Sequence, residues 1–155
     1  MPIPPYVAEL RALVGTRELW LPAVTAVVRR GDEVLLTRRA DNGQWAPVTG
    51  IIDPGEEPGV AARREALEET GVEISVDRLA SVSASPQVTH ANGDLGVYLD
   101  LTFACTWLGG EAHVADDENV EVRWWPLDAL PEMAPFLRER IDAAVAGEVA
   151  ARFTS

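Results

Sequence analysis

Three glutamates crowd onto one side of a predicted helix near the middle of this chain. The helix should begin near Pro58, where a missing backbone N–H costs nothing, and end at Gly71, which suits a left-handed C-cap. At about 100° per residue, Glu65, Glu68 and Glu69 lie within an arc of roughly 100°. Like charges three and four residues apart destabilise a helix, so this pattern predicts a counter-charge close to them.

A divalent cation is the simplest counter-charge for such a cluster. Carboxylate oxygens without histidine or cysteine neighbours favour Mg²⁺ or Mn²⁺ over zinc. The adjacent Arg64 could also hold one carboxylate by a charge-assisted hydrogen bond, while Val60 and Leu67 point to the other side of the helix. Three glutamates alone are also compatible with a solvated acidic face, so the choice depends on the residues before the helix.

The loop before the helix completes a recognisable motif. It is rich in turn-forming residues such as Gly50 and Pro54, and it carries Glu56. The stretch of residues 50–72 resembles the Nudix box, in which glycines, glutamates and one arginine recur at set spacings. The fixed positions are filled by Gly50, Glu56, Arg64, Glu65, Glu68, Glu69 and Gly71, with apolar Ala66 and Val72. Although Ala66 is smaller than the usual apolar residue, a full match is improbable by chance and favours a metal site.

The resemblance to the Nudix family implies a fold. It implies an α/β protein, an α/β/α sandwich with a mixed β-sheet between helices, in a single domain over residues 1–155. Residues 1–20 would form an N-terminal helical extension and residues 135–150 the C-terminal helix. Hydrophobic periodicity and turn residues indicate a compatible order of elements. The predicted helices are 4–14, 58–70 and 135–149, with a helical turn at 126–130, and the predicted strands are 23–30, 33–39, 45–48, 72–76, 79–85, 97–107 and 120–125.

The resemblance also implies an activity, the Mg²⁺-dependent hydrolysis of a diphosphate linkage in a nucleoside diphosphate derivative by water attack at phosphorus. Mn²⁺ could replace Mg²⁺. Carried over position by position, Glu65 and Glu69 would be direct metal ligands and Glu68 a further ligand. The backbone carbonyl of Thr49 would complete the site.

Other positions of the motif would support these ligands. Arg64 would orient Glu65, and Glu56 would brace the loop against the helix. Gly50 and Gly71 would be structural positions.

One more acid is expected from a distant loop, because Nudix enzymes commonly use such a residue as a metal ligand or general base. The acidic residues 116–118 precede a predicted strand, and Glu118 is the preferred candidate. Glu121 is its competitor. A solvated acidic loop is the alternative interpretation.

The charge of such a substrate needs basic partners. Arg38 and Arg39 lie on the strand that enters the site region, and only one should reach the phosphates because strand side chains alternate between faces. Arg39 is the preferred residue. Trp45, Tyr98 or Trp125 could stack on a base, although aromatic residues in strands more often belong to the core.

Composition narrows the classes of partner. The net charge of −12 argues against a general nucleic-acid surface or an anionic membrane surface, and no apolar run is long enough to span a bilayer. Cys105 is the only cysteine, which excludes an internal disulfide and suggests a reducing cytoplasm. The partner that the Nudix resemblance implies is a small nucleotide. The N-terminal helix makes a homodimer possible.

The substrate is harder to choose. Pro86 lies close to the place where ADP-ribose-type Nudix members carry a proline, which puts ADP-ribose-like sugar nucleotides narrowly ahead of (d)NTP pyrophosphohydrolysis of the clean-up type. A non-catalytic nucleotide-sensing module would have lost ligands from the box, and none is lost. An isomerase on the same scaffold would need a cysteine at the site, where Cys105 is poorly placed.

Overall fold

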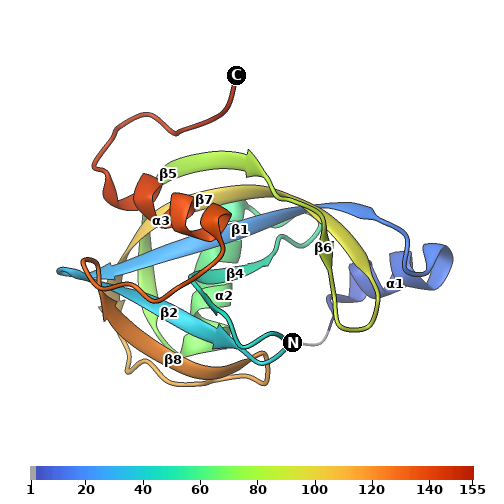
Figure 1. Cartoon of the computed structure of the whole chain (residues 1–155), viewed down its shortest axis with the longest axis horizontal. Coiled ribbons are helices and arrows are strands. Elements are labelled where there is room, and N and C mark those ends of the chain that lie inside the picture. The colour runs from blue at the N-terminus through green and yellow to red at the C-terminus, as the bar shows by residue number, and fades with distance from the viewer. Residues whose placement is uncertain (1–2) are drawn as a thin grey trace.

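The computed structural model describes residues 3–155, and a mixed β-sheet forms its centre (Figure 1). The helices are α1 (Pro5–Val14), α2 (Pro58–Thr70) and α3 (Pro135–Val145) within the described residues. The strands there are β1 (Leu19–Arg30), β2 (Glu33–Arg39), β3 (Trp45–Ala46), β4 (Val48–Ile51), β5 (Glu73–Ala84), β6 (Val88–Thr89), β7 (Leu95–Gly109) and β8 (Asn119–Pro126).

The sheet combines parallel and antiparallel pairs. Its main order is β3-β2-β1-β7-β5, with β4 paired to β1, β6 to β7 and β8 to β2. The long central strands β1 and β7 run parallel, whereas the other pairs run antiparallel. The predicted α/β class with a mixed sheet between helices is confirmed.

Two predicted strands, 23–30 and 45–48, have different boundaries in the structure. The hairpin of β1 and β2 turns at Gly31, whose φ of 60° suits glycine, but β1 starts at Leu19 and not at residue 23. The predicted strand 45–48 is divided at Pro47 into β3 and β4. Proline has no N–H to donate to a strand ladder, which explains the break.

The predicted strands 72–76 and 79–85 are one continuous strand, β5. Its pairing register with β7 shifts between Val76 and Arg78 and again between Leu79 and Ser81. Such bulges absorb an extra residue while the strand continues, so the interrupted hydrophobic pattern did not mark a turn. The edge of β5 is joined by the C-terminal segment, where Arg152 exchanges backbone hydrogen bonds with Ala80 and Val82 at 2.9 and 3.0 Å.

The C-terminal helix is shorter than the predicted range of 135–150. It ends at Val145, and Gly147 follows with a φ of 69°. Its buried residues include Leu137, Ile141 and, unexpectedly, a charged arginine. Pro126 ends β8 and residues 127–129 form the turn that follows, so the predicted helical turn at 126–130 is a strand end and a turn.

The N-terminal helix also differs from its prediction. Within the predicted extension of residues 1–20, α1 covers residues 5–14, and residues 1 and 2 lie outside the described residues. Only Val7 of this helix is buried, whereas Leu13 is 83% exposed. Most apolar side chains of this helix are therefore only partly covered by the rest of the described chain. None of the helices in residues 3–155 is long and apolar enough to cross a membrane.

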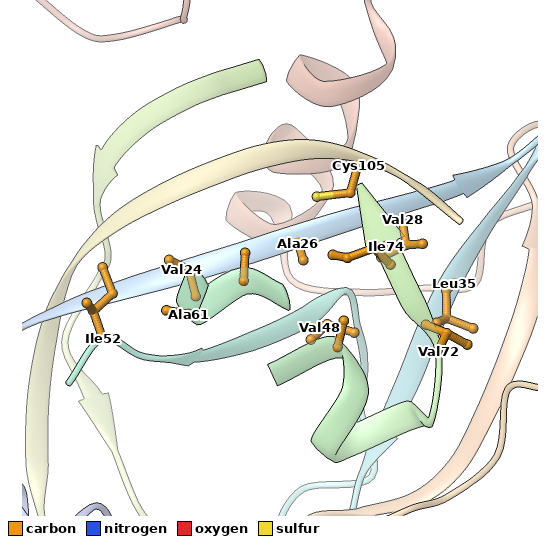
Figure 2. Packing of buried hydrophobic residues seen from close by; sticks show 12 residues of the cluster. Val24, Ala26, Val28, Leu35, Val48, Ile52, Ala61, Val72, Ile74 and Cys105 are labelled. Carbon is orange, nitrogen blue, oxygen red and sulfur yellow. The ribbon is translucent and has the colours of Figure 1, made fainter. Parts of the chain in front are cut away.

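Two apolar clusters lie on opposite faces of the sheet. Because side chains alternate along a strand, Val24, Ala26 and Val28 of β1 join the cluster beneath α2, whereas Val27 joins the cluster beneath α3. Figure 2 shows the first cluster, which includes the buried Cys105. Burial raises the pKa of the Cys105 thiol to about 12, so it is an uncharged core residue.

Candidate functional site

Helix α2 turns its acidic side inward. Its glutamates Glu65 and Glu69 are only 1% and 3% exposed, whereas the apolar Val60 and Leu67 are more than half exposed. The helix has proline in its first turn and the left-handed Gly71 at its C-cap, as the sequence predicts. The other inward positions are the small residues Ala61, Ala62 and Ala66.

Glycine at position 50 permits the closest contact between β4 and α2. A Cβ atom at Gly50 would overlap the carboxyl group of Glu65. One oxygen of that carboxyl group, Oε1, accepts a hydrogen bond of 2.7 Å from Arg64. The other, Oε2, is buried and has no hydrogen-bond partner in the described part of the chain. An unpaired buried carboxylate oxygen is costly, and it marks a place for a donor or a cation.

Arg64 connects the loop to the helix. Its guanidinium donates two hydrogen bonds to Glu56, at 2.8 and 2.9 Å, and contacts Glu65 and Glu68 at 2.7 and 3.2 Å. It also donates to the backbone carbonyl of Ile51 at 3.2 Å. These bonds lower the pKa of Glu56 and raise that of Arg64, so both groups are charged at neutral pH.

The buried carboxyl groups hold their protons more tightly than exposed ones. Burial raises the pKa of Glu65 to about 7, against the opposing effect of Arg64. Burial, together with the negative charges of Glu118 and Glu65, raises the pKa of Glu69 well above its usual range. One oxygen of Glu69 accepts a hydrogen bond of 3.1 Å from Asn119, the first residue of β8.

The two candidate distal acids lie in different surroundings. Glu118, just before β8, acts electrostatically on both buried glutamates, and burial raises its pKa. Glu121 forms an ion pair of 3.2 Å with Arg38 across the β2–β8 pair. The structure thus brings Glu118 to the acidic cluster and places Glu121 and Arg38 together elsewhere.

A cleft of about 960 Å³ lies next to this cluster. Its lining includes Thr49, Gly50 and Glu118 together with residues of α1, β7, α3 and the loop 85–94, but not the glutamates of α2 themselves. Arg39 lines the cleft, and its guanidinium donates two hydrogen bonds to Asp41 at 3.0 and 2.8 Å. Arg38 is not among the lining residues, in line with the expected alternation.

Of the three aromatic candidates, Trp45 and Tyr98 line the cleft. Trp125 does not line it but packs edge-on against Trp45, with ring centroids 5.2 Å apart. The hydroxyl of Tyr98 lies 2.7 Å from Nε2 of His90, which also lines the cleft.

The match to a family model agrees with this geometry. The model described as NUDIX domain matches residues 19–144, which include the acidic helix and all strands of the sheet. The chain belongs to the Nudix family.

Several individual proteins and solved structures are similar to this Nudix chain. It is 34% identical to a MutT-like protein of Streptomyces ambofaciens over 68% of this chain and 63% of that protein. It is 32% identical to an NAD-capped RNA hydrolase, NudC, of Chromobacterium violaceum over 71% of this chain, but the match spans only 39% of that protein. A Nudix hydrolase structure from Nitrosomonas europaea superposes with a TM-score of 0.68 at 25% identity, covering 86% of this chain and 93% of that one.

The donor atoms of the Nudix box suit a hard divalent cation. The nearby side chains offer carboxylate oxygens, and Oε2 of Glu65 is the oxygen that Arg64 does not bind. As they stand, three such groups do not converge into a ligand set in residues 3–155. Glu68 is 51% exposed and bonded to Arg64, so it would have to turn from Arg64 to serve as a ligand.

Two sets of polar residues at the site were missed by the sequence analysis. Asn119, which fixes Glu69, gave no signal of its own among the acidic residues that precede it. A buried pair, Asp100 of β7 and Arg140 of α3, lines the cleft. An aspartate within an apolar strand was a visible signal, but nothing in the sequence pointed to Arg140 as its partner.

Proposed function

We propose that this Nudix chain hydrolyses a diphosphate linkage in a nucleoside diphosphate derivative, with Mg²⁺ or Mn²⁺ as its cofactor. The observation that carries the proposal is the pair of buried carboxyl groups, Glu65 and Glu69, one with an unpaired oxygen, beside a cleft of nucleotide size. Burial of two acids that feel the negative charge of a third, Glu118, is unfavourable unless a cation neutralises them.

In the proposed site, Glu65 and Glu69 hold the cation, with Glu68, Glu118 and the carbonyl of Thr49 as further ligands. The bound cation would neutralise the diphosphate oxygens and lower the pKa of the attacking water. Oxygen ligands suit both Mg²⁺ and Mn²⁺, so the proposed site could use either ion.

The remaining residues act on the geometry and the substrate. Arg64 holds Glu65 in place, supported by Glu56, so that the orphan oxygen keeps its direction. As the alternative to binding the cation, Glu118 would take a proton from the attacking water, and its raised pKa supports this role. Arg39 binds a phosphate oxygen in exchange for its contact with Asp41.

Two substrate classes are proposed in order. ADP-ribose-like sugar nucleotides remain narrowly first, and (d)NTPs second. Pro86, on which the first choice partly rests, is exposed, although its neighbours Ser85 and Gln87 line the cleft. A nucleotide sensor is disfavoured because every charged position of the box is present. The homodimer, the cytoplasmic location and the lack of a nucleic-acid or membrane partner stay predictions.

A substrate screen tests the proposal. The purified chain would be incubated with nucleoside diphosphate sugars, dinucleotides and (d)NTPs, with Mg²⁺ or Mn²⁺, and the products separated by chromatography. A sugar nucleotide should yield a nucleoside monophosphate and a sugar phosphate, and an NTP should yield a nucleoside monophosphate and pyrophosphate. Binding without any product would favour the sensor instead.

The variant Glu69→Gln is the negative control for the substrate screen. The amide keeps the shape of the side chain but loses the charge that holds the cation, so turnover should fall by at least about a hundredfold with a normal fold. Glu73→Gln, an exposed glutamate at the start of β5, is the matched variant and should leave turnover unchanged. Full activity of Glu69→Gln at ordinary Mg²⁺ would refute the assignment of the site.

A further inference from the structure

A second polar network, with no residue from the acidic helix, contributes Asp100 and Arg140 to the lining of the cleft. Asp100 accepts hydrogen bonds from the hydroxyl groups of Thr25 and Thr102, at 2.8 and 2.7 Å. Arg140 donates from Nη1 to Thr25 at 3.1 Å and lies 3.2 Å from Asp100. The four side chains come from β1, β7 and α3, and each is at least nine-tenths buried.

Arg140 is not fully used by this network. Its hydrogen bond to Thr25 and its 3.2 Å contact with Asp100 are both made by Nη1, and Nε is buried without a partner among the described residues. Within residues 3–155, Nη2 forms no hydrogen bond. The guanidinium lies over the ring of Phe136, 5.2 Å from its centroid, and both residues line the cleft. A buried guanidinium with a spare terminal nitrogen at a cleft is an unsatisfied donor.

Asp100, in contrast, uses both of its oxygens. Oδ1 accepts a hydrogen bond from Thr25 and lies 3.2 Å from Nη1 of Arg140, and Oδ2 accepts from Thr102. The aspartate also cancels the charge of the arginine, so this part of the floor offers hydrogen-bond donors without a net charge. Such a site selects an uncharged oxygen acceptor and not a phosphate, which would need an excess of positive charge.

The network is close enough to the box to meet the same substrate. Thr25 is the cross-strand partner of Thr49, the residue just before Gly50, in the β1–β4 pair. Paired residues on adjacent strands lie about 5 Å apart, within the length of a nucleoside whose diphosphate lies at the acidic cluster.

We propose that Arg140 is a specificity-determining residue that donates from Nη2 to an uncharged oxygen of the nucleoside part of the substrate, a base carbonyl or a ribose hydroxyl. This rests on the proposed function for the substrate class. The aromatic residues of the cleft favour the nucleoside end, because Phe136 lies beside Arg140, and Trp45 and Tyr98 line the same cleft. Asp100 and its threonines are positioning residues, which hold the guanidinium rigidly.

A binding experiment without metal separates this proposal from the hydrolysis itself. Uridine, adenosine, their 2′-deoxy forms and a uridine analogue lacking the O4 carbonyl would be titrated in EDTA and followed by NMR chemical shifts. The variant Arg140→Lys keeps the charge but loses the fork and its spare nitrogen. It should weaken binding of the preferred nucleoside about tenfold, the size of one good hydrogen bond.

The analogues identify the acceptor. If the base carbonyl is the acceptor, the variant and the wild type should bind the analogue without O4 equally; if a ribose hydroxyl is, they should bind the deoxy form equally. A tenfold loss for every probe alike, or no loss for any, would overturn the proposal. So would a wild-type cleft that binds no nucleoside at all.

A matched variant and a direct signal exclude a merely structural effect. Arg138→Lys makes the same change at an exposed arginine of α3 that does not line the cleft, so it should leave nucleoside selectivity unchanged. In the wild type, the side-chain N–H signals of Arg140, identified by contacts with the Phe136 ring, should shift when nucleoside is added. This second measurement decides even if Arg140→Lys fails to fold, and unshifted signals would refute the proposal.

Turnover gives an independent comparison. If substrates are cleaved, Arg140→Lys should raise KM about tenfold for the preferred substrate and leave kcat nearly unchanged, because the contact is made equally before and during the reaction. If no substrate is cleaved while nucleosides still bind through Arg140, the proposed hydrolysis fails and this inference stands.

Discussion

Single carboxyl groups decide most of the chemistry proposed for this protein, and their surroundings differ sharply. Glu118 acts on the buried Glu65 and Glu69, whereas Glu121 is bonded to Arg38. Glu118 directly precedes β8 and Glu121 is its third residue, so the two candidates lie three positions apart in the sequence. The surroundings in the structure therefore distinguish the two candidate distal acids, between which the sequence left the choice open.

A side-by-side comparison tests that separation. Glu118→Gln should lower kcat by about a hundredfold or more, because it removes a ligand or the proton acceptor, while Glu121→Gln should stay close to the wild type. Steady-state kinetics at saturating Mg²⁺ would measure both. The opposite ranking would mean that Glu121 leaves Arg38 and serves the site.

The helix arginine offers a second test at the scale of one residue. Arg64→Ala removes the bonds to Glu56, Glu65 and the Ile51 carbonyl, so unfolding free energy should fall by roughly 2 kcal/mol and turnover should drop. The neighbouring Arg63 is exposed, and Arg63→Ala should change neither quantity. Urea unfolding and kinetics on both variants would measure this. Equal behaviour of the two would show that Arg64 serves only solubility.

At the scale of the element, α2 reverses the usual arrangement of a surface helix. It buries alanines and glutamates and exposes Val60 and Leu67. The small side chains let the helix approach β4 closely, and the glutamates then lie at the margin of the cleft. An ordinary amphipathic helix would do the opposite, because burying charge costs more than burying leucine gains.

The close approach of α2 to β4 can be tested with glycine variants. Gly50→Ala should lower unfolding free energy by about 1 to 3 kcal/mol and reduce turnover, because its Cβ would displace the Glu65 carboxyl group. Gly109→Ala is the matched change, since a Cβ there meets nothing within 4 Å and the φ angle is not positive. Thermal unfolding and kinetics of both proteins would check the prediction. An active, stable Gly50→Ala protein would place Glu65 elsewhere.

For the whole molecule, the raised pKa of Glu65 links stability to pH. The carboxyl has a pKa of about 7 when folded and 4.5 as its ordinary value, so the folded state binds the proton more tightly. Its contribution is therefore fully present below pH 4.5 and is lost as the pH rises to about 7. The rise of the pKa from 4.5 to about 7 corresponds to roughly 3 kcal/mol.

Urea unfolding between pH 4.5 and 8 would measure this loss in EDTA. The wild type should lose more stability over this range than Glu65→Gln, whose amide does not titrate. Added Mg²⁺ should restore stability mainly at the upper end of the range, because only the ionised carboxylates bind it. A Glu65→Gln protein with the same pH slope as the wild type would contradict the burial of a titrating carboxyl.

Parts of the site were readable because they are local. The capping residues Pro58 and Gly71, the alternation that separates Arg38 from Arg39 and the spacing of the three glutamates all depend on neighbours within a few residues. Residue periodicity and turn-forming residues depend on backbone geometry, and they predicted the class of the fold and the positions of most helices and strands. Even there, bulges in β5 and the break at Pro47 altered the boundaries.

The sequence by itself determined the acidic motif, the order of strands and helices, and an arginine beside the glutamates that could hold them. Only the tertiary structure decided that the acidic side of α2 faces inward, that Glu118 and not Glu121 joins it, and that Arg140 meets Thr25 across 115 positions of the chain. These are contacts between segments far apart in sequence, and they arise when the packing of the sheet and helices fixes which surfaces meet. Residue spacing describes a segment's own geometry and contains no information about its distant neighbour.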